Sequence, residues 1–337
     1  MFDMKIISII FFFFLGCNDN TNFENIAYGE SPVDSIPMQD YRSAMRNFVI
    51  GISEYAKSKN PQFAIIPQNG IELVTNSGEV SGRPVMPYLN AIDAHGQENL
   101  FYGYDGDNIA TPPRTSKYLT SLLQISQKLG NTIFVIDYCN TSNKISDAYV
   151  RNEKEGFVPF VATERSLNVI PSGLIQTSFE NSLDIENLNQ AKNFLFFLNY
   201  EKYQFKELVL SELEKTNYDV IFIDLFFNDG EAFNLEDIAR LKTKANGALR
   251  KVICYMSIGE AEDYRFYWKK EWNTAPPRWL DEENINWPGN YKVRYWDSEW
   301  QNIIFGHSEA YLDQIIGTGF DGVYMDIIDG FEYYENK

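Results

Sequence analysis

Short, continuously apolar runs alternate with amphipathic stretches along most of the chain. Runs such as "TIFVIDYC" at 132–139 are typical of strands that are buried on both faces of a parallel sheet. Stretches such as 39–58, where apolar residues recur every three or four positions, predict helices that cover such a sheet. The predicted strands lie in the runs "FAIIPQNG", "LNAIDAHGQENLFYG", "TIFVIDYC", "NFLFFLNY", "DVIFIDLFF", "KVICYMSIGEAE", "YKVRYWD" and "GVYMD", with "FVPFVAT" as a ninth candidate. The predicted helices span 39–58, 115–129, 144–155, 201–216, 235–245 and 299–316, with Asn234 capping the fifth and a capping box at Ser298–Gln301 opening the sixth.

This alternation predicts an α/β fold in residues 39–337, and the number of strand–helix units is that of a (β/α)8 TIM barrel. A doubly wound sheet is the competing architecture, because it would hold the same strands. However, no glycine-rich phosphate loop follows the first strand of either half of the chain. The barrel is therefore the favoured fold.

The first 17 residues, "MFDMKIISIIFFFFLGC", have the features of an export signal. The apolar run Ile6–Leu15 is too short to remain as a membrane-spanning helix. A small residue followed by Cys17 resembles a lipobox, which predicts cleavage before Cys17 and lipidation of its thiol. The alternative is an ordinary signal peptide with a chance cysteine, since Phe14 replaces the usual aliphatic residue. Residues 18–38 are polar and predict a flexible tether, so the protein is expected to be exported and lipid-anchored to a bacterial membrane, on its periplasmic or cell-surface side.

The composition narrows the range of partners. The 337 residues are 44% hydrophobic and carry a formal net charge of -18. Such a chain is expected to repel nucleic acid and to tolerate cationic ligands. No metal or other cofactor is expected, because the chain has only two histidines, and two of its three cysteines lie in apolar runs that predict burial. These residues are His95, His307, Cys139 and Cys254.

Polar side chains end most of the predicted strands. In a barrel, the carboxyl ends of the strands build the active site. A single acidic residue there is more often a helix cap, but five or more on one rim favour a site in which crowding raises the pKa of one carboxyl group. The residues at these ends are Gln68, Asn69, Glu98, Asp137, Tyr138, Asp224, Glu260, Trp296, Asp297 and Asp326, and Arg265 is the one basic residue expected among them.

Residues 187–335 contain the runs "YDVIFIDLF", "LKTKANGALRKVICYMSIGEAEDYRFYW", "PPRWLDEEN", "WPGNYKVRYWDSEW" and "GFDGVYMDIID". They resemble glycoside hydrolase family 114, the endo-α-1,4-polygalactosaminidase-like family of TIM barrels. That family continues past the last motif with pieces that this chain carries at its beginning, such as "AIDAHGQENLFY" and "GFVPFVATERSL".

The resemblance therefore implies a circularly permuted barrel. Residues 39–165 correspond to the family's C-terminal half, 187–337 to its N-terminal half, and 166–186 join the two. Cuts in loops are tolerated by closed folds. The alternatives are two incomplete halves of tandem domains or a mis-assembled gene, but the strands form one complementary set.

The resemblance also implies a glycosidase that cleaves an α-1,4-linked, galactosamine-containing polysaccharide internally. Carried over residue by residue, Asp326 is the nucleophile or base and Glu98 the acid/base, with a retaining mechanism favoured. A surface glycan-binding protein without turnover is the alternative, and the acidic charge and export signal argue against an aminoacyl-tRNA-synthetase-like role. Substrate-binding roles are predicted for Glu260, Asp224, Tyr255, Tyr264, Arg265, Trp296, Asp329, Asn69, Asp137 and Tyr138, by stacking on sugars or by bonding to hydroxyl or ammonium groups.

Overall fold

The computed structural model describes residues 39–171, 179–228 and 230–337. The predicted signal, the Cys17 lipidation site and the tether lie outside these residues, as does part of the predicted joining segment. Among the helices described, none is long and apolar enough to cross a membrane.

Parallel strands form the centre of the molecule. One five-stranded sheet has the order β1-β11-β7-β6-β5, and a three-stranded sheet has the order β2-β3-β4. All neighbouring strands in these two sheets run parallel. The strands are β1 (Ala64–Pro67), β2 (Ala94–Glu98), β3 (Thr132–Tyr138), β4 (Val158–Ala162), β5 (Phe194–Phe196), β6 (Val220–Ile223), β7 (Lys251–Ser257) and β11 (Gly322–Asp326). The predicted α/β class with parallel sheets is confirmed.

The two parallel sheets adjoin at both of their edges. At one edge, Gln68 and Gly96 form a parallel bridge between β1 and β2, and Asn69 N donates a 2.8 Å hydrogen bond to Gly96 O. At the other edge, β4 lies in contact with β5. In the part of the chain that the structure describes, eight parallel strands thus follow one another in space, and β11 pairs with β1.

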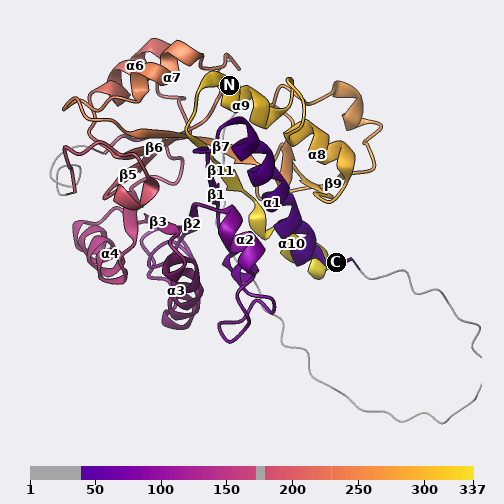
Figure 1. Cartoon of the computed structure of the whole chain (residues 1–337), viewed down its shortest axis with the longest axis horizontal. Helices are drawn as coiled ribbons and strands as arrows, with labels where there is room; N and C mark the ends of the chain where they lie inside the picture. Colours follow the sequence, from indigo (N-terminus) through magenta and orange to yellow (C-terminus); the bar gives the residue numbers. More distant parts are fainter. Residues whose placement is uncertain (1–38, 172–178, 229) are drawn as a thin grey trace, which may run out of the picture.

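Helices surround these strands, as Figure 1 shows. The helix α1 illustrates why: its apolar residues, among them Phe48 and Ile52, recur at helical spacing and are buried, and Asp40 caps its start by accepting a hydrogen bond from Ser43 N. The helices are α1 (Tyr41–Lys59), α2 (Met86–Ala91), α3 (Pro113–Lys128), α4 (Ser142–Glu155), α6 (Lys206–Glu214), α7 (Leu235–Leu241), α8 (Ser298–Ile304), α9 (Tyr311–Thr318) and α10 (Phe331–Glu335), with short 3-10 helices at Ile71–Val74, Leu188–Gln190, Lys270–Asn273 and Ile328–Gly330.

Aromatic side chains from both sheets fill the space between the strands. The ring centroids of Phe134 and Phe222 lie 5.3 Å apart, and those of Phe222 and Tyr324 lie 5.0 Å apart. Phe196 also contacts Tyr324 at 5.0 Å. Because these rings come from β3, β5, β6 and β11, the two sheets share one interior.

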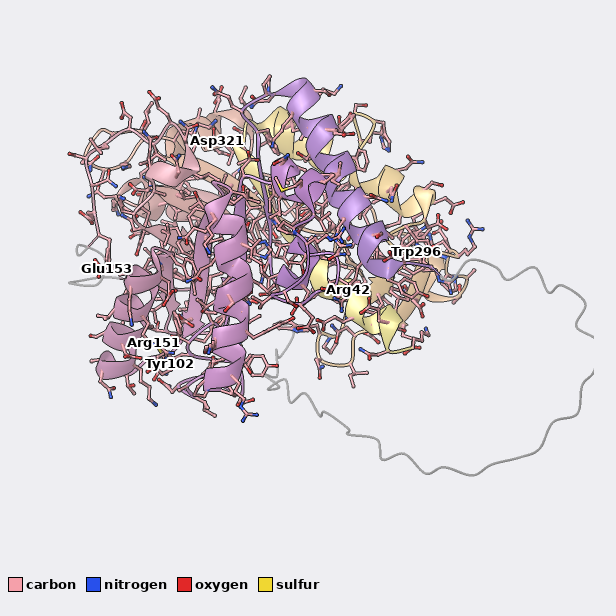
Figure 2. All side chains as sticks on the ribbon, turned by 60° about the horizontal axis from the view of Figure 1, so that its bottom comes forward. Arg42, Tyr102, Arg151, Glu153, Trp296 and Asp321 are labelled. Carbon is pink, nitrogen blue, oxygen red and sulfur yellow. The ribbon has the colours of Figure 1, made fainter. Side chains whose placement is uncertain are left out.

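The two ends of the described chain pack together. Arg42 on α1 makes a bidentate ion pair with Glu335 on α10, with N–O distances of 2.8 and 3.0 Å. Beside it, Tyr41 packs against Trp296 and Tyr334, with ring centroids 5.1 and 5.5 Å away. Figures 1 and 2 show α1 next to α10, with Arg42 and Trp296 on this side of the molecule.

One predicted strand belongs to a different sheet. The run "YKVRYWD" supplies β10 (Asn290–Val293), which pairs antiparallel with β8 (Glu260–Glu262) and β9 (Leu280–Glu283) in a small separate sheet. Residues 290–292 are only half-buried, which a central parallel strand does not permit. The ninth candidate, "FVPFVAT", is β4 and takes its place among the parallel strands.

Three helix predictions also need correction. The predicted helix 299–316 is two helices, α8 and α9, because the chain turns between them at Gly306, whose φ is 116°. The cap of α8 is Asp297, which accepts a hydrogen bond from Glu299 N, and not a Ser298–Gln301 box. The predicted helices 201–216 and 235–245 are shorter, at α6 and α7, and Asn234 caps α7 as predicted.

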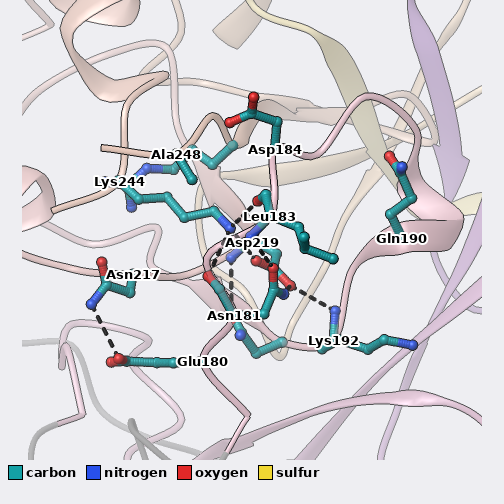
Figure 3. Close-up of polar contacts among 12 residues, drawn as sticks. Glu180, Asn181, Leu183, Asp184, Gln190, Lys192, Asn217, Asp219, Lys244 and Ala248 are labelled. Atoms are coloured by element: carbon teal, nitrogen blue, oxygen red, sulfur yellow. Dashed lines mark hydrogen bonds and ion pairs between the residues drawn. The ribbon is translucent and has the colours of Figure 1, made fainter. Parts of the chain in front are cut away.

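A buried polar cluster anchors the described part of the joining segment (Figure 3). Lys244 donates to Asp219 at 2.6 Å and to the backbone oxygen of Leu183 at 2.9 Å, and both charged side chains are fully buried. Asn181 donates to the other oxygen of Asp219. These bonds fix residues 181–183 to the beginning of β6 and to the turn before β7.

Candidate active site

The ends of β11, β1 and β2 direct two carboxyl groups to one space. Side chains alternate along a strand, so residues two apart face the same side. Tyr324 faces the interior, and its hydroxyl lies so close to Gly96 that a Cβ there would collide with it. Asp326 and Glu98 lie two residues beyond Tyr324 and Gly96, so both point toward the same interior space above that tyrosine.

Asp326 is held by two hydrogen bonds. Tyr255 donates its hydroxyl to Oδ2 at 2.6 Å, and the backbone N–H of Ile327 donates to Oδ1 at 2.8 Å. Burial and, second, the charge of Glu98 nevertheless raise the pKa of Asp326 to about 8, although the Tyr255 bond acts to lower it. At neutral pH the carboxyl of Asp326 is therefore mostly protonated.

Glu98, like Asp326, is bound by a tyrosine hydroxyl. Tyr138, which ends β3, donates its hydroxyl to Glu98 Oε1, and Asn69 Oδ1 accepts from Glu98 N at 3.0 Å. Asn69 itself has a left-handed backbone with φ 58°, and its carbonyl is 2.9 Å from His95 Nε2. Asn69 thus positions the end of β2 through its side-chain oxygen.

These two carboxyl groups can perform acid–base chemistry together. Neighbouring carboxylates resist a second ionisation, so such a pair retains one proton over a wide pH range. Hydrolysis of a glycosidic bond needs this state: one group protonates the leaving oxygen, and the other attacks or activates water.

A second acidic region continues from the pair toward the end of the chain. Burial, with the charge of Glu332 second, raises the pKa of Asp329 to about 7, and Lys292 opposes this rise. Burial, with Glu72 second, likewise raises the pKa of Glu332 to about 7. Because the charge of Asp329 also acts on Asp326, the acidic region is continuous with the pair.

Asp224 and Arg265 form a buried network beside the pair. Arg265 binds both oxygens of Asp224 at 2.8 and 2.7 Å and Glu262 at 2.5 Å. Tyr264 donates its hydroxyl to Glu262 at 2.6 Å, and its ring is largely exposed. The network reaches the pair through Tyr255, since burial, then the charges of Asp326 and Glu262, raise the pKa of that phenol.

Glu260 serves the small antiparallel sheet. Its carboxylate pairs with Lys292 of β10 and accepts a 2.8 Å hydrogen bond from Asn284, in the turn between β9 and β10. Glu260 is fully buried, so these contacts satisfy a charge that would otherwise be costly. Its charge also acts on Asp329.

Two predicted site residues lie elsewhere. Asp137 faces the opposite side of β3 from Tyr138, where it accepts hydrogen bonds from Phe101 N, Tyr102 N and Asn152 Nδ2. Figure 2 shows Tyr102 on the far side of the molecule from Trp296. Trp296 follows β10, and its ring contacts are those with other aromatic rings near the chain ends. The structure does not bring Asp137 or Trp296 to the carboxyl pair.

The sequence reasoning missed Tyr324 and Gly96 at this site. The available signal was the alternation in "GVYMD", which puts Tyr324 on the same face as Asp326. Among the described residues, no group of three or more His, Cys, Asp or Glu side chains could hold a metal ion.

Comparisons with known proteins concern the C-terminal part of the chain. Residues 197–337 match the model of glycoside-hydrolase family GH114, and this part contains Asp326 but not Glu98. An uncharacterized protein of Methanocaldococcus jannaschii is 42% identical over 162 residues, which are 47% of this chain and 44% of that protein.

Two further relatives match over similar lengths. An uncharacterized protein of Thermotoga maritima is 41% identical over 135 residues, and one of Deinococcus radiodurans is 40% identical over 128 residues. The matches cover 40% and 39% of these two proteins, so the chain spans less than half the length of each relative. The C-terminal part of the chain therefore resembles a glycoside hydrolase, and the names of the relatives state no activity.

Proposed function

We propose that this protein is a glycoside hydrolase whose catalytic pair is Asp326 and Glu98. The observation that carries the proposal is the pair itself: two carboxyl groups at the ends of β11 and β2, the strands on either side of β1, each bound by a tyrosine hydroxyl. The match of residues 197–337 to a glycoside-hydrolase family supports it independently.

In the proposed reaction, Glu98 donates a proton to the leaving oxygen and Asp326 attacks the anomeric carbon or activates water. Asp326 must then be ionised, although burial raises its pKa and favours its protonated form. Hydrogen bonds from Tyr255 and Ile327 N stabilise the carboxylate and help this ionisation. A substrate cation near Asp326 would add to this effect and move the shared proton toward Glu98.

The proposed substrate is an α-1,4-linked, galactosamine-containing polysaccharide, cleaved internally. The acidic surroundings support a cationic amino sugar, because Asp329 and Glu332 extend the negative region beyond the pair and the chain carries a net charge of -18. Glu260, Asp224, Arg265 and Tyr264 stay proposed substrate-binding residues, with Asp224 and Glu260 acting from within ion pairs.

We further propose that the two parallel sheets form one closed (β/α)8 barrel with a permuted chain order. The contacts at both sheet edges and the aromatic interior shared by β3, β5, β6 and β11 support closure. The packing of α1 against α10 supports a cut between sequence ends that are adjacent in space.

Export and lipid anchoring through Cys17 are proposals that rest on the sequence. Metabolic labelling with palmitate tests them: label should enter the wild-type protein and be absent from Cys17→Ala. Label retained in the variant would exclude this anchor.

The proposed activity is tested with purified residues 39–337 on partly deacetylated galactosaminoglycan and other α-glycans. Wild type should release oligosaccharides, and Asp326→Asn and Glu98→Gln should each lower the rate by at least about a hundredfold, since general acid–base catalysis contributes that much. Asp137→Asn is the control, because this acid lies on the other face of β3. Binding without hydrolysis by wild type would instead indicate a glycan-binding protein without turnover.

A further inference from the structure

The buried hydroxyl of Tyr324 lies next to the carboxyl pair and is unsatisfied. Solvent does not reach this oxygen, and it has no hydrogen-bond partner among the residues that the structure describes. A buried hydroxyl without a partner costs about 1–3 kcal/mol in mutational data. Phenylalanine would fill the same space without this cost, so the hydroxyl calls for an explanation.

The surroundings of Tyr324 limit what its hydroxyl can bind. The ring packs against Phe196 and Phe222, and the oxygen lies against Gly96, where no side chain blocks it. The charged groups that act on the phenol are Glu98 and Asp326, which add to the effect of burial in raising its pKa. Tyr324 therefore keeps its proton and is a donor that faces two acceptors.

We infer that Tyr324 is a positioning residue of the pair: its O–H donates a hydrogen bond to a carboxylate of Glu98 or Asp326 once the pair is singly ionised. The bond forms when the acceptor becomes charged, because charged acceptors bind donors more strongly than neutral ones. Tyr138 and Tyr255 already bind one carboxyl each, and Tyr324 lies between them. The pair would then have three phenolic donors, which together favour the state with one proton.

Other groups lie near the pair. Gln68, which follows β1, is uncharged, and the charge of Asp329 opposes the ionisation of Asp326. Arg165 lies 3.9 Å from the ring centroid of Tyr138 and acts through that tyrosine. The groups that surround the pair are thus Tyr138 of β3, Tyr255 of β7, Tyr324 of β11, Gln68 after β1, Asp329 after β11 and Arg165 after β4.

The test is a pH titration of the pair in Tyr324→Phe, monitored by the infrared absorption of the carboxyl groups. The absorption bands are assigned with Asp326→Asn and Glu98→Gln. Loss of a donor to the carboxylate should raise the lower apparent pKa of the pair by about one pH unit, a tenfold change in proton affinity. Tyr88→Phe is the matched control, since its hydroxyl is also buried and unpartnered among the described residues, but Arg46 is the charged group that acts on it.

An unchanged or lowered apparent pKa in Tyr324→Phe, or an equal rise in Tyr88→Phe, would overturn the inference. The melting temperature should not fall, because the ring stacking is retained. If Tyr324→Phe does not fold, a fluorotyrosine at position 324 repeats the test with the hydroxyl present: its more acidic phenol should lower the apparent pKa of the pair.

The catalytic meaning of Tyr324 rests on the proposed function, but the titration needs no substrate. If the apparent pKa of the pair shifts in Tyr324→Phe but the wild-type protein has no glycosidase activity, the inference stands and the proposed function does not. If the wild-type protein is an active glycosidase but the apparent pKa of the pair is unchanged in Tyr324→Phe, the proposed function stands and the inference does not.

Discussion

The buried ion pair between Lys244 and Asp219 should be the strongest single polar contribution to stability at the amino-terminal ends of the strands (Figure 3). Lys244→Met keeps an unbranched apolar side chain of similar bulk and removes the ammonium group. The carboxylate of Asp219 then keeps donors from Asn181 and Lys192 N but loses its counter-charge. The backbone oxygens of residues 181 and 183 lose their shared donor as well.

The size of the effect follows from the burial of both charges. Removing one partner of a fully buried pair costs about 3–5 kcal/mol, because the remaining charge is left without compensation. The hydrogen bond to the backbone oxygen of Leu183 is lost as well, whereas the oxygen of Asn181 still accepts from Asn246 Nδ2 at 3.2 Å. Against a total stability of about 5–15 kcal/mol, this is a large fraction.

Urea unfolding at neutral pH measures this loss as a lower midpoint with an unchanged slope. Lys215→Met is the control, because Lys215 forms an exposed pair with Glu212 that should contribute no more than about 1 kcal/mol. The double variant Asp219→Asn/Lys244→Met removes both charges and should recover much of the loss. Proteolysis within residues 179–190 should also be faster in Lys244→Met, because this segment loses its hydrogen bonds to the Lys244 ammonium group.

A loss below about 1 kcal/mol in Lys244→Met, equal to that of the exposed control, would show that this cluster does not hold the joining segment. A double variant that loses the sum of both single losses would show that the two charges act independently. Either result would refute the reasoning from burial.

Two further predictions concern the pair and the chain order. Burial raises the pKa of Asp326 from 3.8 to about 8 on folding, so between these values the folded state holds a proton that the unfolded state has lost. The stability of the fold should therefore decrease as the pH rises from about 4 to about 8. The side chain in Asp326→Asn stays neutral, so the melting temperature of this variant should rise relative to that of wild type as the pH increases over this range. A difference in melting temperature that does not change with pH would contradict the raised pKa. A chain reordered as 187–337 followed by 39–165 through a flexible linker should fold with the same far-ultraviolet circular dichroism, and an unfolded product would argue against the permuted barrel.

The local pattern of the sequence predicted the buried strands well and the small antiparallel sheet poorly. A run such as "GVYMD" has no polar residue before its end, which only a strand covered on both faces can accept. The run "YKVRYWD" is equally rich in β-forming residues, but Lys292 and Arg294 interrupt it. That alternation is typical of a half-exposed antiparallel strand, and reading it in that way would have placed Trp296 outside the rim.

The partners within the site could not be predicted in the same way. Tyr255 and Asp326 are 71 residues apart, and the pairing of β7 with β11 is what brings them together. Adjacent residues such as Asp137 and Tyr138 cannot both face the interior, so one of the two fails to reach the pair. Which one fails depends on the register of β3 against β2 and β4, and no local pattern encodes that register.

At the carboxyl ends of β1, β2 and β11, a buried hydroxyl without a partner among the described residues lies beside a carboxyl group with a raised pKa. Elsewhere, Lys244 and Asp219 form a fully buried ion pair, and Asp137 and Arg250 are held by uncharged hydrogen-bond partners. At these strand ends, burial raises the pKa of Asp326, and the Tyr324 hydroxyl has no hydrogen-bond partner within the described part of the chain. A chain selected for stability alone would replace both at little structural cost, whereas a catalytic site must keep groups whose energies improve only when charge develops there. The same residues that weaken the fold at this edge are therefore the ones that a reaction at this edge would use.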